Sequence, residues 1–140
     1  MLFAAMLTGR FFLGGLFAAL GGVSLYIMTE AVLLSFYSPS QSIIMVSTIV
    51  GGGVGAGIGG FLGWFSHGDG KRNFVVLGLA LAGGFGGGQL GLLRGEYAEH
   101  VMGMPGVPEL GNLVYGTVIG ANLLPLFYFV LRRLRGERLV

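Results

Sequence analysis

Hydrophobic positions in this chain gather in four long, nearly uncharged stretches. They cover about residues 11–36, 42–66, 74–93 and 112–131. Each stretch reaches the roughly 20 residues that an α-helix needs to cross a hydrocarbon core about 30 Å thick. We therefore predict an all-α integral membrane protein in which residues 1–140 form a single membrane domain, a four-transmembrane-helix bundle.

Polar segments separate these stretches and end the chain. Residues 37–41 and 67–73 read as short turns, and residues 94–111 read as one long loop. Residues 132–140 form a basic tail. Because the turn at residues 67–73 is short, we expect the second and third helices to be antiparallel neighbours.

Glycines form a second pattern inside two of the stretches. Residues 51–60 read GGGVGAGIGG, and residues 83–91 read GGFGGGQLG. A glycine inside a helix costs roughly 1 kcal/mol in water, but in a bilayer small residues let helix backbones approach closely. Residues four apart share one helix face, so we predict glycine-zipper packing. The predicted packing residues are Gly51, Gly55, Gly59, Gly63, Gly83, Gly84, Gly87, Gly88 and Gly91.

The partners of these glycine faces stay open at this stage. One face suits the hairpin between the second and third stretches, and the others suit the first stretch, the fourth stretch or another protein chain. Residues 55–60 and 86–91 also fit the G-x-G-x-x-G string of dinucleotide-binding folds. That motif needs a preceding strand, whereas here it lies inside apolar stretches, which argues against nucleotide binding.

The composition excludes several classes of protein. The 140 residues are 54% hydrophobic and only 10% charged, whereas about 25% is typical of a globular domain. The chain has no cysteine, which excludes disulfides, thiolate metal sites and cysteine nucleophiles. The net charge of +2 does not indicate nucleic-acid binding, because the basic residues flank apolar segments.

The basic residues predict an orientation. Of the 8 lysines and arginines, only Arg94 falls in the long loop, and the others lie at the N-terminus, in the second turn and in the tail. By the positive-inside rule, both termini are cytoplasmic and loop 94–111 lies outside, in a membrane of the bacterial inner-membrane type. Tail residues Arg132, Arg133 and Arg135 suit anionic lipid headgroups.

Glu30 is the one acidic residue inside an apolar stretch. An intramembrane carboxylate suggests proton or cation transport. If the first helix begins near Arg10, however, twenty residues carry it about 30 Å, to the opposite interface. We therefore expect Glu30 at the interface, with an interhelical partner or a transport role as alternatives.

The other polar candidates within the stretches are Gln89, Asn122 and Pro125. Pro125 has no N–H for the carbonyl of Ala121 and should kink its helix. Asn122 would support that kink or bond to another helix, and Gln89 is a similar case; an ion or ligand site is the alternative.

The two histidines do not point to a cofactor. His67 follows Trp64 and Phe65, a group typical of a membrane interface. The weak metal candidates Glu96, Glu99 and His100 come from one short segment without a second cluster. We therefore expect no metal and no cofactor.

An internal repeat is a further hypothesis. Residues 10–22 align with residues 72–84 at a constant offset, with arginine, phenylalanine, alanine and a closing Gly-Gly pair in common. Glycine-rich apolar segments also align by chance, so both explanations stay open.

Two functions from different classes remain. The first is a non-catalytic structural or accessory subunit that packs within a larger membrane assembly, such as an energy-converting one. The second is a homo-oligomeric channel, pore or small-solute transporter that uses Glu30 and the mid-span polar residues. We favour the first, because glycine lies on several faces and no catalytic motif is recognisable. The expected partners are membrane lipid and other transmembrane subunits or copies of this chain.

Overall fold

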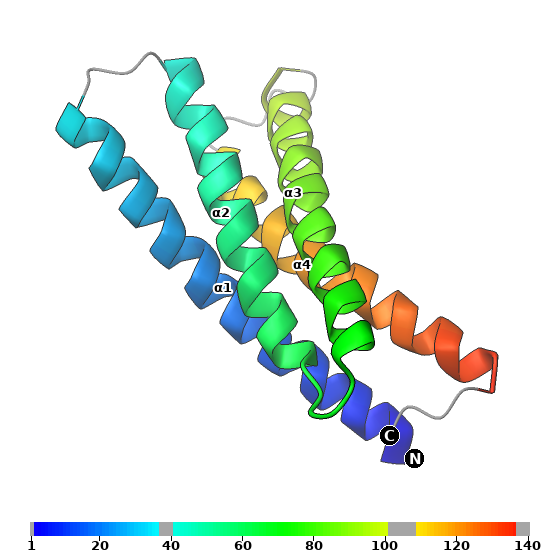
Figure 1. Ribbon diagram of the computed structural model, residues 1–140. Helices are drawn as coiled ribbons and strands as arrows, with labels where there is room; N and C mark the ends of the chain where they lie inside the picture. Colours follow the sequence, from blue (N-terminus) through cyan, green and yellow to red (C-terminus); the bar gives the residue numbers. More distant parts are fainter. Residues whose placement is uncertain (1, 37–40, 101–108, 137–140) are drawn as a thin grey trace.

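The computed structural model describes residues 2–36, 41–100 and 109–136 (Figure 1). This part of the chain is helical, with two short turns. It contains four helices: α1 (Leu2–Phe36), α2 (Gln41–Trp64), α3 (Gly70–His100) and α4 (Glu109–Leu134).

Three of the helices are long and apolar enough to cross a membrane. The candidate spans are Phe3–Leu33, Gly70–Arg94 and Gly111–Leu134, while α2 contributes a shorter apolar segment, Ile49–Trp64, among the described residues. Many large apolar side chains, such as Phe12, Phe74 and Tyr115, point outward from the bundle. This agrees with the predicted all-helical membrane protein, since lipid rather than water tolerates such a surface.

The helices extend beyond the apolar stretches from which they were predicted. α1 begins at Leu2, well before residue 11, and α3 continues through residues 94–100, which we expected in the long loop. The reason is that hydropathy marks where a segment stops suiting lipid, whereas backbone hydrogen bonds continue through ordinary helix formers such as glutamate and alanine. The rest of that loop up to residue 108 lies outside the described residues.

The bundle consists of two closely packed hairpins. α1 lies along α2, and α3 lies along α4 (Figure 1). α2 joins the hairpins, because it contacts both α3 and α4, and α1 also contacts α4. Within the described ranges, the backbones of α1 and α3 do not pack directly against each other.

Glycines on α2 bring its backbone against that of α1. A Cβ added at Gly55 would overlap the carbonyl oxygen of Gly21, and one at Gly59 would overlap that of Phe17. A Cβ at Gly63 would overlap the backbone of Gly14. The Gly51, Gly55, Gly59, Gly63 row of α2 therefore faces α1 and not α3.

The α3–α4 contact is built in the same way. A Cβ added at Gly83 would overlap the carbonyl oxygen of Gly120, and one at Gly87 would overlap that of Gly116. Gly91 lies equally close to the carbonyl of Asn112. Contacts between glycine Cα–H groups and carbonyl oxygens are a recurring feature of helix pairs that pack this closely.

Of the remaining predicted glycines, Gly84 lies where the two hairpins meet, and Gly88 belongs to the α3–α4 contact. A Cβ at Gly84 would come within 2.7 Å of the carbonyl oxygen of Gly53 on α2, and one at Gly88 within 2.8 Å of the Thr117 methyl on α4. All nine predicted packing glycines thus lie at contacts inside this chain.

Candidate functional site

A buried polar pair links the end of α2 to α4 in the interior of the bundle. The indole Nε1 of Trp64 donates a hydrogen bond of 3.1 Å to Oδ1 of Asn122. The Asn122 amide in turn donates to the carbonyl of Val118 at 2.8 Å, within α4. Trp64 and Asn122 are 0% and 1% exposed, so both side chains are withdrawn from the surroundings.

Gly14 of α1 makes room for this pair. A Cβ at Gly14 would overlap Oδ1 of Asn122 and would lie 3.1 Å from Nε1 of Trp64. Three helices therefore meet at one hydrogen bond. Of the roles considered for Asn122, the structure shows an interhelical bond, and the partner is a tryptophan that the sequence pattern had placed at the membrane interface.

Pro125 lies fully buried in α4, one turn after Ala121. Since proline has no N–H, the carbonyl of Ala121 lacks its usual helical donor. Gly60 of α2 packs against this carbonyl, because a Cβ added at Gly60 would come within 3.0 Å of the Ala121 oxygen. The break in the α4 hydrogen-bond ladder is thus covered by a neighbouring helix.

Two arginines surround an aromatic ring at one end of the bundle. The guanidinium carbons of Arg10 and Arg72 lie 5.6 and 5.8 Å from the centre of the Phe129 ring, which stacks on Trp64. Arg10 also donates to the carbonyl of Trp64, at 3.2 Å. Arg10 and Arg72 occupy equivalent positions in the repeat that aligns residues 10–22 with residues 72–84. The contacts fasten α1 and α3 to the end of α4.

The turn between α2 and α3 is held by side chains. Oδ1 of Asp69 accepts a hydrogen bond of 3.0 Å from the backbone N–H of Arg72, which makes Asp69 the N-cap of α3. Asp69 Oδ2 also lies 3.7 Å from Nε of Arg72. Asn73 exchanges two hydrogen bonds with the backbone of Ser66, at 2.7 and 3.1 Å.

We expect Asp69→Ala to lower the free energy of unfolding by about 1 kcal/mol, because the first turn of α3 loses its cap. Asp69→Asn should retain most of that stability, since asparagine caps as well as aspartate. Unfolding in mixed detergent micelles measures both variants. Equal losses in the two variants would mean that the contact with Arg72, and not the cap, carries the effect.

The tail arginines begin at the same end of the molecule. Arg132 donates to the Tyr128 hydroxyl at 3.3 Å, and Arg133 lies over the ring of Phe3 at the start of α1. Arg133 and Arg135 are exposed. Basic side chains from α1, α3 and α4 therefore gather at one end, as expected for a headgroup-facing surface.

The remaining polar candidates are not brought together with Asn122. Gln89 is exposed on α3. Glu30 lies in α1, but its side chain is outside the part of the structure that is described. The same holds for Glu96, Glu99 and His100 on α3, and among the side chains that are described no group of three metal-ligating residues occurs.

One face of α3 meets no neighbouring helix within the part of the chain that the structure describes. Gly78, Ala82 and Gly86 follow each other at spacings of four, and all three are exposed. A Cβ added at Gly78 or Gly86 would meet nothing within 4 Å. Gln89 lies on the same side of the helix. We call these four residues the α3 docking face. Sequence reasoning missed it, although the same four-residue spacing was visible there.

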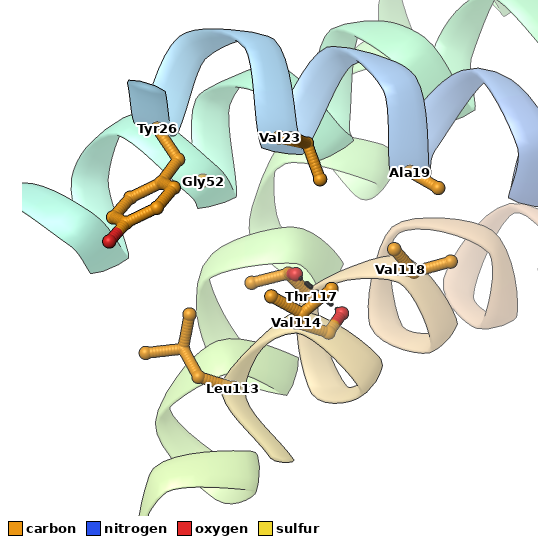
Figure 2. Close-up of a pocket in the computed structure, with 9 residues that line it drawn as sticks. Ala19, Val23, Tyr26, Gly52, Leu113, Val114, Thr117 and Val118 are labelled. Atoms are coloured by element: carbon orange, nitrogen blue, oxygen red, sulfur yellow. Dashed lines mark hydrogen bonds between the residues drawn. The ribbon is translucent and has the colours of Figure 1, made fainter. Parts of the chain in front are cut away.

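A small cavity lies between α1, α2 and α4 (Figure 2). Its volume is about 20 Å³, room for a single water molecule. The Thr117 hydroxyl at its wall donates to the carbonyl of Val114 at 2.8 Å, and Tyr26 closes one side. The cavity is thus too small and too apolar to bind a substrate.

Comparison with known proteins adds no relative. No protein-family model, no curated protein and no solved structure matches this chain.

Proposed function

We propose that this chain is a non-catalytic accessory subunit of a larger membrane assembly, such as an energy-converting complex, and that it docks there through the α3 docking face. The observation that carries the proposal is the exposed row of Gly78, Ala82 and Gly86 with Gln89 beside it. The nine glycines predicted from the sequence, by contrast, already have partners inside the chain.

This face has the chemistry of an interface between membrane helices. Small residues at a spacing of four form a shallow groove into which a second helix backbone fits. Gln89 lies five residues inside the end of the apolar span Gly70–Arg94, and its side chain is exposed on the outer side of α3. A polar side chain in hydrocarbon is stabilised by an interhelical bond, worth about 1 kcal/mol. A partner helix would supply that bond.

The rest of the bundle supports a scaffold. Four helices packed through glycine contacts would hold the α3 docking face rigid. The interior is filled by large buried side chains, namely Trp64, Val76, Asn122, Pro125 and Phe129. A channel or transporter would therefore need its pathway between copies of the chain. We place that second function behind the first, because both polar ends of Asn122 are already bonded.

The proposed orientation follows from the basic end. Arg10, Arg72 and Arg133 lie where the start of α1, the α2–α3 turn and the end of α4 meet. We assign this end, and both termini, to the cytoplasmic side of a bacterial-type inner membrane, with the opposite end outside. The exposed tail arginines would contact anionic lipid.

The test compares Gly86→Leu with the matched control Gly15→Leu, since an added Cβ meets open space at both positions. After mild detergent extraction from the source membrane, native mass spectrometry identifies the subunits that remain bound to the chain. We expect the wild type and Gly15→Leu to remain bound to larger subunits at fixed stoichiometry. Gly86→Leu should be found without these subunits.

Retention of Gly86→Leu in the same complex would contradict the proposed docking face. A homo-oligomer of the wild type, without other subunits, would instead favour the channel or transporter. Flux assays on Asn122 variants would then be the next step.

A further inference from the structure

A groove runs along the outer surface between α3 and α4, separate from the cavity of Figure 2. Its volume is about 260 Å³. Its floor consists of the glycines that bring the two helices together, and its walls are apolar side chains such as Leu90 and Ile119. The groove exists because helices that touch through glycines leave a depression above the contact.

The dimensions of the groove match one leaflet of a bilayer. Along α4 it extends from Asn112 to Leu123, which at 1.5 Å per residue is about 16 Å. That is close to half of the roughly 30 Å hydrocarbon core. One acyl chain of a single leaflet would therefore lie along it.

The polar end of the groove lies at headgroup depth. Arg94 ends the apolar span that begins at Gly70, and its side chain is exposed. Asn112 lies beside it on α4, and its buried amide nitrogen has no hydrogen-bond acceptor among the described residues. Arg94 offers accessible donors, and phosphodiester oxygens are acceptors with the complementary charge. The Asn112 amide has a donor that is free among the described residues and reaches the phosphate once its side chain turns toward the groove.

We propose that the α3–α4 groove binds a glycerophospholipid of the surrounding bilayer, with one acyl chain over the glycine floor and the phosphate held by Arg94 and Asn112. The groove borders the α3 docking face but does not include Gly78, Ala82, Gly86 or Gln89. Lipid binding and subunit docking are therefore tested by different variants.

The chain contains its own control groove. A second groove of about 240 Å³ lies between α1 and α2, over the Gly21–Gly55 contact. Its lining is also apolar, including Leu20 and Ile58, but it contains no charged residue. A groove of that kind takes a hydrocarbon chain without selecting for a phosphate.

The experiment is native mass spectrometry of the detergent-solubilised full chain with two added lipids. Phosphatidylethanolamine is the probe, because its zero net charge removes bulk charge attraction. Diacylglycerol with the same acyl chains lacks the phosphate. We expect the chain to retain one phosphatidylethanolamine with an affinity at least about fivefold above that for diacylglycerol.

Three variants locate the site. Arg94→Gln should lower phosphatidylethanolamine affinity about fivefold and leave diacylglycerol unchanged. Ile119→Trp should fill the α3–α4 groove and lower both affinities, whereas Ile58→Trp in the α1–α2 groove should lower neither. Ile119 and Ile58 are 52% and 43% exposed, so both substitutions point out of the bundle.

Three results would overturn the proposal. One is equal affinity for the two lipids in the wild type, and another is wild-type phosphatidylethanolamine binding by Arg94→Gln. The third is the same loss from Ile58→Trp as from Ile119→Trp. Unfolding curves in mixed micelles that coincide with the wild type show that each variant tested is folded.

Discussion

Replacing Gly87 by leucine should separate α3 from α4 and lower the free energy of unfolding by about 3 kcal/mol or more. A Cβ at this position overlaps the carbonyl oxygen of Gly116, and backbone cannot rotate away as a flexible side chain does. The two helices must move apart along their whole contact. The backbone contacts Gly83–Gly120, Gly87–Gly116 and Gly91–Asn112 are then lost together.

The matched control for this prediction is Gly78→Leu on the same helix. An added Cβ there meets nothing within 4 Å, so unfolding in mixed micelles should be unchanged or slightly more difficult. The account of the α3–α4 contact would be wrong if Gly87→Leu and Gly78→Leu had the same stability. Gly78→Leu should still weaken assembly, since Gly78 belongs to the α3 docking face.

Trp64→Ala is the second substitution with a large expected effect, a loss of about 4 kcal/mol. Trp64 is 0% exposed, stacks on Phe129 with ring centres 5.2 Å apart, and donates to Asn122. Truncation leaves a cavity among three helices and an unpaired buried oxygen on Asn122. The same unfolding assay in mixed micelles measures this loss of stability.

Phe65→Ala provides the comparison, because Phe65 follows Trp64 in sequence but is 41% exposed. It should cost much less, roughly 1 kcal/mol or below. Trp64→Phe should cost less than Trp64→Ala and more than Phe65→Ala, since it keeps a buried ring but loses the hydrogen bond and part of the ring volume. An effect of Phe65→Ala equal to that of Trp64→Ala would contradict the burial on which the prediction rests.

The sequence was sufficient to predict the helices, but not to predict which helix each glycine face contacts. Long apolar stretches predict helices at membrane length, and the structure agrees for an all-helical protein with three such helices. A row of glycines indicates which face of a helix packs closely, but it does not indicate which helix packs against that face. The Gly55–Gly59 face of α2 meets α1, because α1 offers Gly14 and Gly21 at matching depths.

The candidate site was predicted only in part. Asn122 stood out as a polar residue in an apolar stretch, but its partner Trp64 looked like an interfacial aromatic residue. What buries Trp64 is the space left by Gly14 on a distant helix, which no local pattern reveals. Gln89 resembled Asn122 in sequence, yet it lies exposed on α3 because its helix presents that side outward.

The most direct test of the central claim is photocrosslinking in the source membrane. A photoreactive amino acid replaces Ala82 on the α3 docking face or, as a control, Leu16, which is 56% exposed on α1. We predict one crosslinked product of fixed mass between position 82 and another membrane protein, with only lipid adducts from position 16. Lipid adducts alone at position 82, or the same products from both positions, would contradict the accessory-subunit account.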